Sequence, residues 1–203
     1  MNLMMEMIAL PNYADINGRP MKKLQIEQYL RKLQLNDFEP TVNLATLTKL
    51  QDAHLKYIPY ENFDCLNGKI TSLKRQDMFN KVIMHNRGGI CFELNGLYNW
   101  LLESLGFDVT SYSARFIDKM ETYQLRRHRV MCVALGDKRY LTDVGVNSES
   151  PRVPLEITEG LIQSDDISQY KFTRSEFVLA GCSGRRNAAK SGNASLALPK
   201  SRR

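Results

Sequence analysis

The spacing of apolar residues changes at Gly106, and this change limits the chain to few architectures. Upstream of Gly106, apolar residues recur every three or four positions, as along one face of an α-helix. Downstream, apolar runs of strand length alternate with turns that contain glycine or proline. Because helices and strands occupy separate halves of the chain, we predict an α+β fold with two subdomains rather than one doubly wound sheet.

Four helical segments are predicted before Gly106, and they begin near Met21, Asn43, Ser72 and Cys91. Ser72 has the side chain of an N-cap residue, and Gly106 stands where a helix-terminating glycine belongs. The last segment has the strongest apolar stripe, formed by Leu94, Leu97, Leu101, Leu102 and Leu105. We therefore predict a helical bundle over residues 21–106, preceded by an N-terminal extension over residues 1–20 that has no clear periodicity.

Strand character follows in five segments, namely 107–116, 129–135, 139–146, 153–157 and 170–177. Gly136-Asp137-Lys138 is a tight turn between the second and third of them. These segments predict a β domain over residues 107–178.

The net charge of +6 belongs entirely to the C-terminal end of the chain. Residues 1–176 contain all 22 acidic residues and 22 of the 28 basic ones, so this part is electroneutral. The excess is carried by Arg185, Arg186, Lys190, Lys200, Arg202 and Arg203. Since the surrounding residues are Gly, Ser, Ala and Asn, we predict a basic, disordered tail over residues 179–203. The neutral body argues against a nucleic-acid partner.

The four cysteines, Cys65, Cys91, Cys132 and Cys182, show neither metal-ligand spacing nor the density of a disulfide framework. We predict no metal site and a reducing, cytoplasmic location. The apolar N-terminus is interrupted by Glu6 and has no basic segment before it, so we expect neither a signal peptide nor a membrane span.

Cys91 is the candidate nucleophile. Gly88-Gly89 allows a sharp turn directly before it, and Cys91 then falls in the first turn of the fourth helix. At that position, unpaired backbone N–H groups and the helix dipole favour a thiolate, and the same N–H groups can stabilise an oxyanion. The alternative is a buried cysteine that only packs at a helix start.

A base and an orienting carboxylate are available on the predicted hairpin. If Gly136-Asp137 forms its two-residue loop, position 128 pairs with position 145. Asp143 then lies diagonally across from His128 on the same face, whereas a one-residue slip would separate the two side chains. Cysteine, histidine and carboxylate are the parts of thiol acyl transfer. His85 is a weaker candidate, which we expect in the last turn of its helix. His54 is another, which we expect at the surface near a helix end, with a local structural role as the alternative.

The chain resembles the arylamine N-acetyltransferase family in three motifs. Residues 87–95 hold the family's Arg-Gly-Gly-x-Cys and the Glu and Asn that follow it, and residues 58–62 resemble its Ile-Pro-Phe-Glu-Asn. His128 matches the histidine that opens a barrel strand, and residues 142–145 match the Asp-Val-Gly element. The resemblance covers about residues 22–176.

This resemblance implies a helical domain, a β-barrel domain, a cysteine-proteinase-like triad and a third α/β lid domain. It assigns the triad to Cys91, His128 and Asp143, and it makes Glu61 and Arg87 a buried pair that supports the nucleophile turn. Acetyl-CoA would acetylate Cys91, and a small aromatic amine, arylhydroxylamine or hydrazine would then accept the acetyl group.

Two departures from the family pattern stand out. Val146-Asn147 replaces the usual Phe-Gly, which changes the predicted wall of the substrate cleft. The basic tail stands where the lid would begin, and we hypothesise that residues 181–203 are a replaced C-terminus. Two alternatives stay open: an amide synthase of the same fold that uses another acyl thioester, and an inactive remnant or binding protein with a basic tail.

Overall fold

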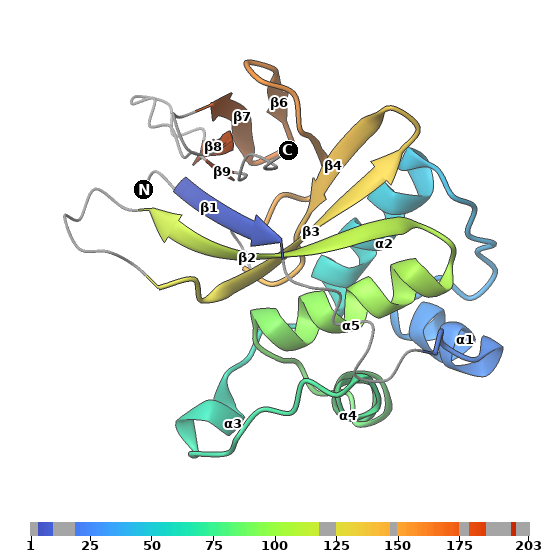
Figure 1. The fold of residues 1–203 in the computed structure, drawn as a ribbon. Helices are drawn as coiled ribbons and strands as arrows, with labels where there is room; N and C mark the ends of the chain where they lie inside the picture. The colour runs from blue at the N-terminus through green and yellow to red at the C-terminus, as the bar shows by residue number, and fades with distance from the viewer. Residues whose placement is uncertain are drawn as a thin grey trace.

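The computed structural model describes residues 4–9, 19–117, 125–146, 150–174, 179–185 and 196–197, with side chains described over 19–115, 125–146 and 150–173. Most helices precede most strands in the chain, as predicted (Figure 1). The helices are α1 (Lys23–Lys32), α2 (Leu44–Tyr57), α3 (Phe63–Leu66), α4 (Arg75–Phe79), the π-helix η2 (Asn80–Met84) and α5 (Cys91–Ser104).

The described strands form two sheets. The larger has the order β5-β4-β3-β2-β1-β9, in which only β1 and β9 are parallel. Its strands are β1 (Met4–Ala9), β2 (Asp108–Ile117), β3 (His128–Leu135), β4 (Lys138–Thr142), β5 (Leu155–Glu156) and β9 (Leu196–Ala197). The smaller is antiparallel and consists of β6 (Ile162–Ser164), β7 (Ser168–Arg174) and β8 (Leu179–Arg185).

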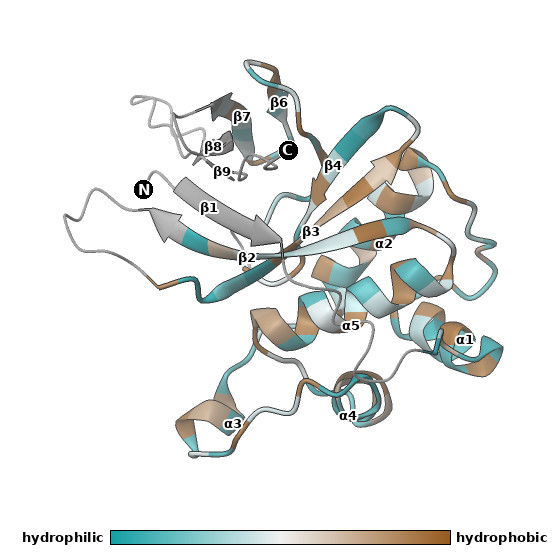
Figure 2. Ribbon diagram, viewed as in Figure 1, coloured by the Kyte–Doolittle hydropathy of each residue, from teal (hydrophilic) through white to brown (hydrophobic). Residues whose placement is uncertain are grey.

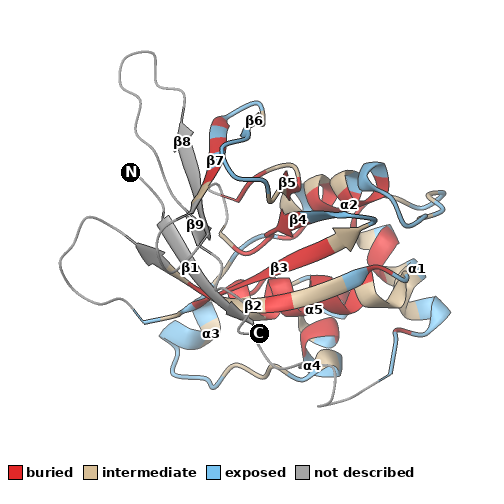
Figure 3. Cartoon of the chain, turned by 45° about the horizontal axis from the view of Figure 1, so that its top comes forward, coloured by how far each residue is buried: buried red, intermediate tan, exposed pale blue. Residues whose placement is uncertain are grey.

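Helix α5 lies along one face of the larger sheet, below β2 and β3 in Figure 1. It ends where the sequence predicts, because Gly106 adopts a left-handed φ of 92° and Phe107 N donates to Leu102 O at 3.0 Å. Figure 3 shows most of α5 and β3 as buried, whereas the region of α3 is largely exposed. The helix that begins with Cys91 is therefore the central packing element.

The core is divided between the two faces of β3. Met131 and Val133 pack into a cluster shared with the helices, while Val130 packs with Phe172 of β7 in a second cluster between the sheets. This alternation follows the two-residue period of a strand. Figure 2 shows the corresponding apolar stretches on β3 and on parts of α2 and α5.

The two sheets modify the predicted barrel. Within the described residues they are separately hydrogen-bonded and enclose the second cluster, rather than forming one continuous ladder. β5 is only two residues long, and Gly160, with φ 78°, lies in the connection that leads to β6. The chain therefore leaves the larger sheet early and starts a new one.

The two ends of the chain contain strands that the sequence pattern did not indicate. β1 lies within the predicted N-terminal extension, and β8 begins at residue 179, so the prediction of disorder is wrong for residues 179–185. Ladder hydrogen bonds join backbone groups, and a segment without an apolar pattern can therefore still pair. Residues 186–195 and 198–203 lie outside the described part of the chain, as do all six basic side chains of the predicted tail.

The predicted helix cap at Ser72 is wrong. α4 begins three residues later, and the Ser72 hydroxyl instead donates to Asp77 Oδ2 at 2.6 Å. The chain then continues directly into η2. A serine two or more residues ahead of a helix can form the same kind of local bond, and sequence alone does not distinguish the two positions.

The two minor histidines have different outcomes. His85 lies at the C-terminal end of η2, as predicted, and its side chain is exposed. His54 is fully buried, with ring centroids 6.0 Å from Tyr29 and 5.3 Å from Tyr98, so its predicted exposure is wrong. Burial lowers the pKa of His54 to about 3. The imidazole therefore acts as a neutral core ring. No helix in the described ranges is long and apolar enough to cross a membrane.

Candidate active site

The nucleophile turn depends on close approach of two backbone segments. A Cβ atom at Gly88 would overlap the Pro59 carbonyl and lie 2.8 Å from Glu61 Cγ. Gly89 pairs with Tyr60 in a parallel bridge, and its carbonyl accepts a hydrogen bond from Glu61 N at 3.0 Å. The two glycines thus let the backbone of the turn pack closely against the backbone of the segment before α3. Cys91 follows the turn as the first residue of α5.

The first turn of α5 is capped by its own carboxylate. Ile90 N donates to Glu93 Oε2 at 3.0 Å, which satisfies a backbone N–H that the helix itself cannot pair. Cys91, in the same turn, is 9% exposed. Its side chain is therefore held at the N-terminus of a well-defined helix, where negative charge is favoured.

The hairpin has the register that the site requires. Leu135 pairs with Lys138 and Met131 with Thr142, so the loop contains Gly136 and Asp137. His128 Nε2 lies 2.7 Å from Asp143 Oδ2, and both side chains are buried. The predicted diagonal contact is confirmed.

Cys91 completes the group of three. Its Sγ donates to the Arg127 carbonyl at 3.5 Å, and its side chain also hydrogen-bonds the His128 ring. Because Nε2 of His128 is taken by Asp143, Nδ1 is the nitrogen available to the thiol. Burial lowers the pKa of His128, but Asp143, with a smaller contribution from Cys91, raises it to about 9. The ring can therefore remain an imidazolium at neutral pH and stabilise a thiolate.

Asn95 holds the orienting carboxylate, a role that the motif analysis missed. Its Nδ2 donates to Asp143 Oδ1 at 2.8 Å and to the Arg129 carbonyl at 2.5 Å, and its Oδ1 accepts from Val144 N at 2.9 Å. Gly145 N also donates to Asp143 Oδ1, at 2.8 Å. The available signal was spacing, since Asn95 lies four residues after Cys91 and so shares its face of α5.

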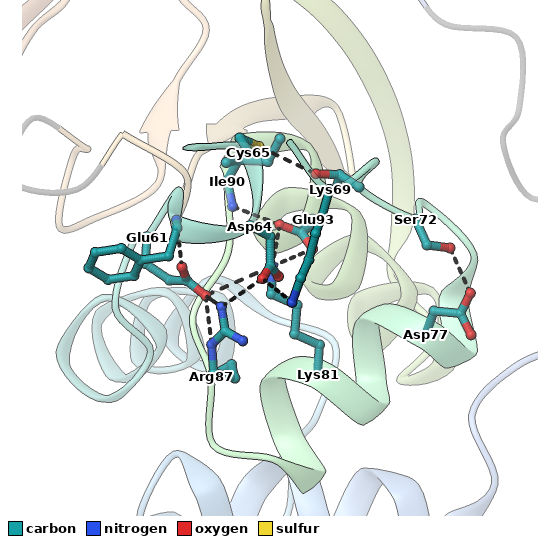
Figure 4. A network of polar contacts seen from close by, with 12 residues as sticks. Glu61, Asp64, Cys65, Lys69, Ser72, Asp77, Lys81, Arg87, Ile90 and Glu93 are labelled. Atoms are coloured by element: carbon teal, nitrogen blue, oxygen red, sulfur yellow. Dashed lines mark hydrogen bonds and ion pairs between the residues drawn. The ribbon is translucent and has the colours of Figure 1, made fainter. Parts of the chain in front are cut away.

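The predicted pair of Glu61 and Arg87 is present but not isolated. Glu61 Oε1 accepts from Arg87 Nε at 3.0 Å and from Nη2 at 2.7 Å. The Glu61 side chain is 9% exposed and that of Arg87 is 40% exposed, so only the carboxylate is buried. Asp64 and Lys81, which the sequence did not single out, join the pair in one network (Figure 4). Bonds from Lys81, together with weaker ones from Arg87, lower the pKa of Asp64 to about 2.

Tyr60 contributes an aromatic ring beside the nucleophile. It is 37% exposed, and its pKa is raised by burial and by the neighbouring Cys91. A thiol, an imidazole and a partly exposed aromatic ring therefore lie close together. Within the described residues, no group of three or more His, Cys, Asp or Glu side chains has the arrangement of a metal site.

The chain is similar to known acetyltransferases in sequence and in fold. The sequence model of the N-acetyltransferase family matches residues 43–188. An arylamine N-acetyltransferase from Mycolicibacterium smegmatis is 36% identical over 152 residues, which are 72% of this chain and 55% of that protein. Proansamycin X synthase from Amycolatopsis mediterranei is 32% identical over 162 residues, 77% of this chain and 61% of that protein.

The solved structures agree with the sequence comparison. The structure of Mycobacterium marinum arylamine N-acetyltransferase in complex with CoA superposes with a TM-score of 0.75 at 26% identity, and the match covers 85% of this chain and 64% of that one. The chain spans about half the length of the M. smegmatis relative.

Proposed function

The chain belongs to the N-acetyltransferase family, and on that premise we propose that it transfers an acetyl group from acetyl-CoA to the nitrogen of an arylamine, arylhydroxylamine or hydrazine. The observation that carries this proposal is the contact between Cys91 and His128, whose other nitrogen is 2.7 Å from the buried Asp143. A cysteine activated in this way is a nucleophile rather than a packing residue.

In the first half-reaction, the Cys91 sulfur attacks the thioester carbonyl of acetyl-CoA. A new S–C bond forms, the bond from the acetyl carbon to the CoA sulfur breaks, and the thiol proton passes through His128 to the leaving CoA thiolate. The backbone N–H groups in the first turn of α5 favour the negative charge that develops on the carbonyl oxygen. Asp143 keeps the imidazole oriented throughout.

In the second half-reaction, the amine nitrogen attacks the acetyl-Cys91 carbonyl. The C–N bond forms, the C–S bond breaks, and His128 takes the proton that the nitrogen loses. Cys91 is left as a thiolate opposite an imidazolium, which is the starting state. The ring of Tyr60 beside Cys91 supports an aromatic acceptor.

A second candidate function is amide synthesis from another acyl thioester. What motivates this alternative is the similarity to a relative named as a synthase, proansamycin X synthase, over a match as long as those to the acetyltransferases. Val146 is consistent with a cleft wall of changed shape where the family pattern has phenylalanine; Asn147 lies outside the described residues.

We also keep the prediction of a cytoplasmic location. Cys65, Cys91 and Cys132 are free thiols, which supports a reducing compartment.

Intact-protein mass spectrometry of the chain as it stands tests the proposal. Mixing with acetyl-CoA should add one acetyl group, which an arylamine then removes. The adduct should be absent in Cys91→Ala and present in the control Cys65→Ala, because Cys65 is an exposed thiol that pairs with Thr71 Oγ1 rather than with His128. An adduct formed only with a different acyl thioester would favour the synthase. A folded chain that forms no adduct with any thioester would overturn both functions.

A further inference from the structure

Lys81 lies at the centre of the ionic network below the nucleophile turn (Figure 4). Its Nζ lies 2.9 and 3.1 Å from the two oxygens of Glu93, 2.9 Å from Asp64 Oδ2 and 3.8 Å from Glu61 Oε1. Its side chain is only 17% exposed. A surface lysine with one exposed partner contributes little to a protein, but this ammonium group joins three carboxylates from three segments.

The π-helix explains why Lys81 reaches this position. η2 follows α4 without a break and carries Lys81 as its second residue. The Lys81 carbonyl also accepts a hydrogen bond from Arg87 N at 3.1 Å, so both ends of the residue contact the segment that leads to Cys91. Single π-turns within helices are rare and often occur at functional sites. In this chain, the π-helix η2 positions the ammonium group of Lys81.

Lys81 neutralises the negative charge of the Glu93 carboxylate. Glu93 is two residues after Cys91 in the first turn of α5, and its side chain is 4% exposed. Among the described residues, Lys81 is its cationic partner. Because Cys91 and Glu93 are both buried, solvent screens their interaction poorly, and an uncompensated carboxylate there would oppose a thiolate.

We propose that Lys81 is a positioning residue for Cys91 that acts through Glu93. It holds the Glu93 carboxylate in place to cap Ile90 N and neutralises its charge, so that the first turn of α5 keeps its preference for a thiolate. This inference rests on the proposed role of Cys91 as the nucleophile.

The other charged groups around this pair do not duplicate the role of Lys81. Cys91 faces His128 and Tyr60, from β3 and from the segment before α3. Arg87 bonds Glu61 and lies 3.3 Å from Asp64. Burial alone would lower the pKa of Lys81, but its bonds to Glu93 and Asp64 raise it above the usual value, so Lys81 stays charged wherever the thiolate is needed.

The test measures alkylation of Cys91 by iodoacetamide as a function of pH, with the modified peptide identified by mass spectrometry in a Cys65→Ala background. Lys81→Met should move the midpoint of the profile to higher pH and slow alkylation at pH values below the original midpoint roughly tenfold, the effect of a shift of about one pKa unit. Lys81→Arg should retain the original profile.

Two further variants separate a charge effect from loss of structure. Glu93→Gln alone should move the midpoint to lower pH, because it removes a negative charge next to Cys91 and leaves Lys81 with one fewer carboxylate to balance it. Lys81→Met combined with Glu93→Gln should return the profile toward the original, since Gln still offers an oxygen to Ile90 N. Lys138→Met removes a lysine that pairs with Glu156 far along the hairpin and should change nothing.

An unchanged profile in folded Lys81→Met would overturn the inference, as would slow alkylation that Glu93→Gln fails to restore. If Lys81→Met does not fold, Glu93→Gln still tests the proposal, because it should move the midpoint of the alkylation profile to lower pH. A folded Glu93→Gln chain with an unchanged midpoint would count against the proposal. Alkylation needs no acetyl-CoA. A shifted profile in a chain that forms no acetyl adduct would therefore support the role of Lys81 and refute the acetyl-transfer function.

Discussion

Single buried polar atoms determine the geometry of the candidate site. Asp143 is fully buried, and the oxygen that does not contact His128 accepts from both Asn95 and the backbone of Gly145. A buried carboxylate needs such donors, because it has lost its hydration. The orientation of the imidazole thus depends on an amide that takes no direct part in the reaction.

Asn95→Ala should therefore slow acetylation of Cys91 by up to about 100-fold, since small displacements of reacting groups have effects of that size. The matched control is Asn99→Ala on the same face of α5, where the amide bonds Glu103 and accepts from Ser111 instead of touching the triad. Stopped-flow acetylation rates decide the comparison. Equal rates in the two variants would show that Asn95 does not orient Asp143.

His54 is expected to make the fold sensitive to acid. Its pKa is about 3 in the folded chain and about 6.5 when unfolded, so between these values the unfolded state binds the extra proton. Stability should then fall as the pH drops from 6.5 toward 3, by up to about 1.4 kcal/mol per pH unit from this residue.

Urea unfolding of His54→Phe across this range should show a shallower decrease than the original chain. His85→Phe, at an exposed position, should keep the original slope. If the free energy of unfolding depends on pH equally in the original chain and in His54→Phe, the His54 ring does not make the fold sensitive to acid.

At the scale of elements, the site depends on how closely the end of the hairpin approaches α5. A Cβ atom on Gly145 would lie 2.8 Å from Cys91 Cα and 2.6 Å from Asn95 Nδ2. The hairpin register puts the side chains of Asp143 and His128 on the same face of the sheet. Gly145, which has no side chain, lets that face approach α5 closely. Register and close approach are separate requirements.

Gly145→Ala should force the two elements apart, with a loss of stability of about 1–3 kcal/mol and slower acetylation of Cys91. Gly136→Ala is the control, because its left-handed φ of 62° makes alanine unfavourable by about 1–2 kcal/mol while no atom near the site is touched. The two variants should thus have similar unfolding free energies and different acetylation rates. A Gly145→Ala chain with the original rate would contradict this account.

For the molecule as a whole, the second core couples the two sheets. Phe172 of β7 is fully buried against a cluster that includes Val130 and Leu141 of the larger sheet. Val130 is only two residues from His128 on β3. The smaller sheet therefore supports the strand that carries the candidate base.

Phe172→Ala should destabilise the chain by about 3–5 kcal/mol, as expected for a large side chain removed from a core. Ile162→Ala on β6, where the side chain is 66% exposed, should have little effect. Denaturant titrations measure both, and a Phe172→Ala chain of unchanged stability would show that the smaller sheet contributes nothing to the fold.

The sequence by itself determined the features that depend on short-range order. The glycine turn before Cys91, the end of α5 at Gly106 and the loop that pairs His128 with the region of Asp143 all follow from local backbone preferences and from the two-residue period of strands. These features placed all three members of the site.

Only the tertiary structure decided which charges and rings are buried together. His54 lies in the core because α1 and α5 supply Tyr29 and Tyr98 around it, and Lys81 is a central cation because α3, η2 and α5 meet beneath the nucleophile turn. The sequence pattern likewise did not indicate that β1 pairs with β2 or that β8 pairs with β7, since their ladder bonds use backbone groups. Burial and ion pairing depend on residues far apart in the chain, and no local pattern encodes them.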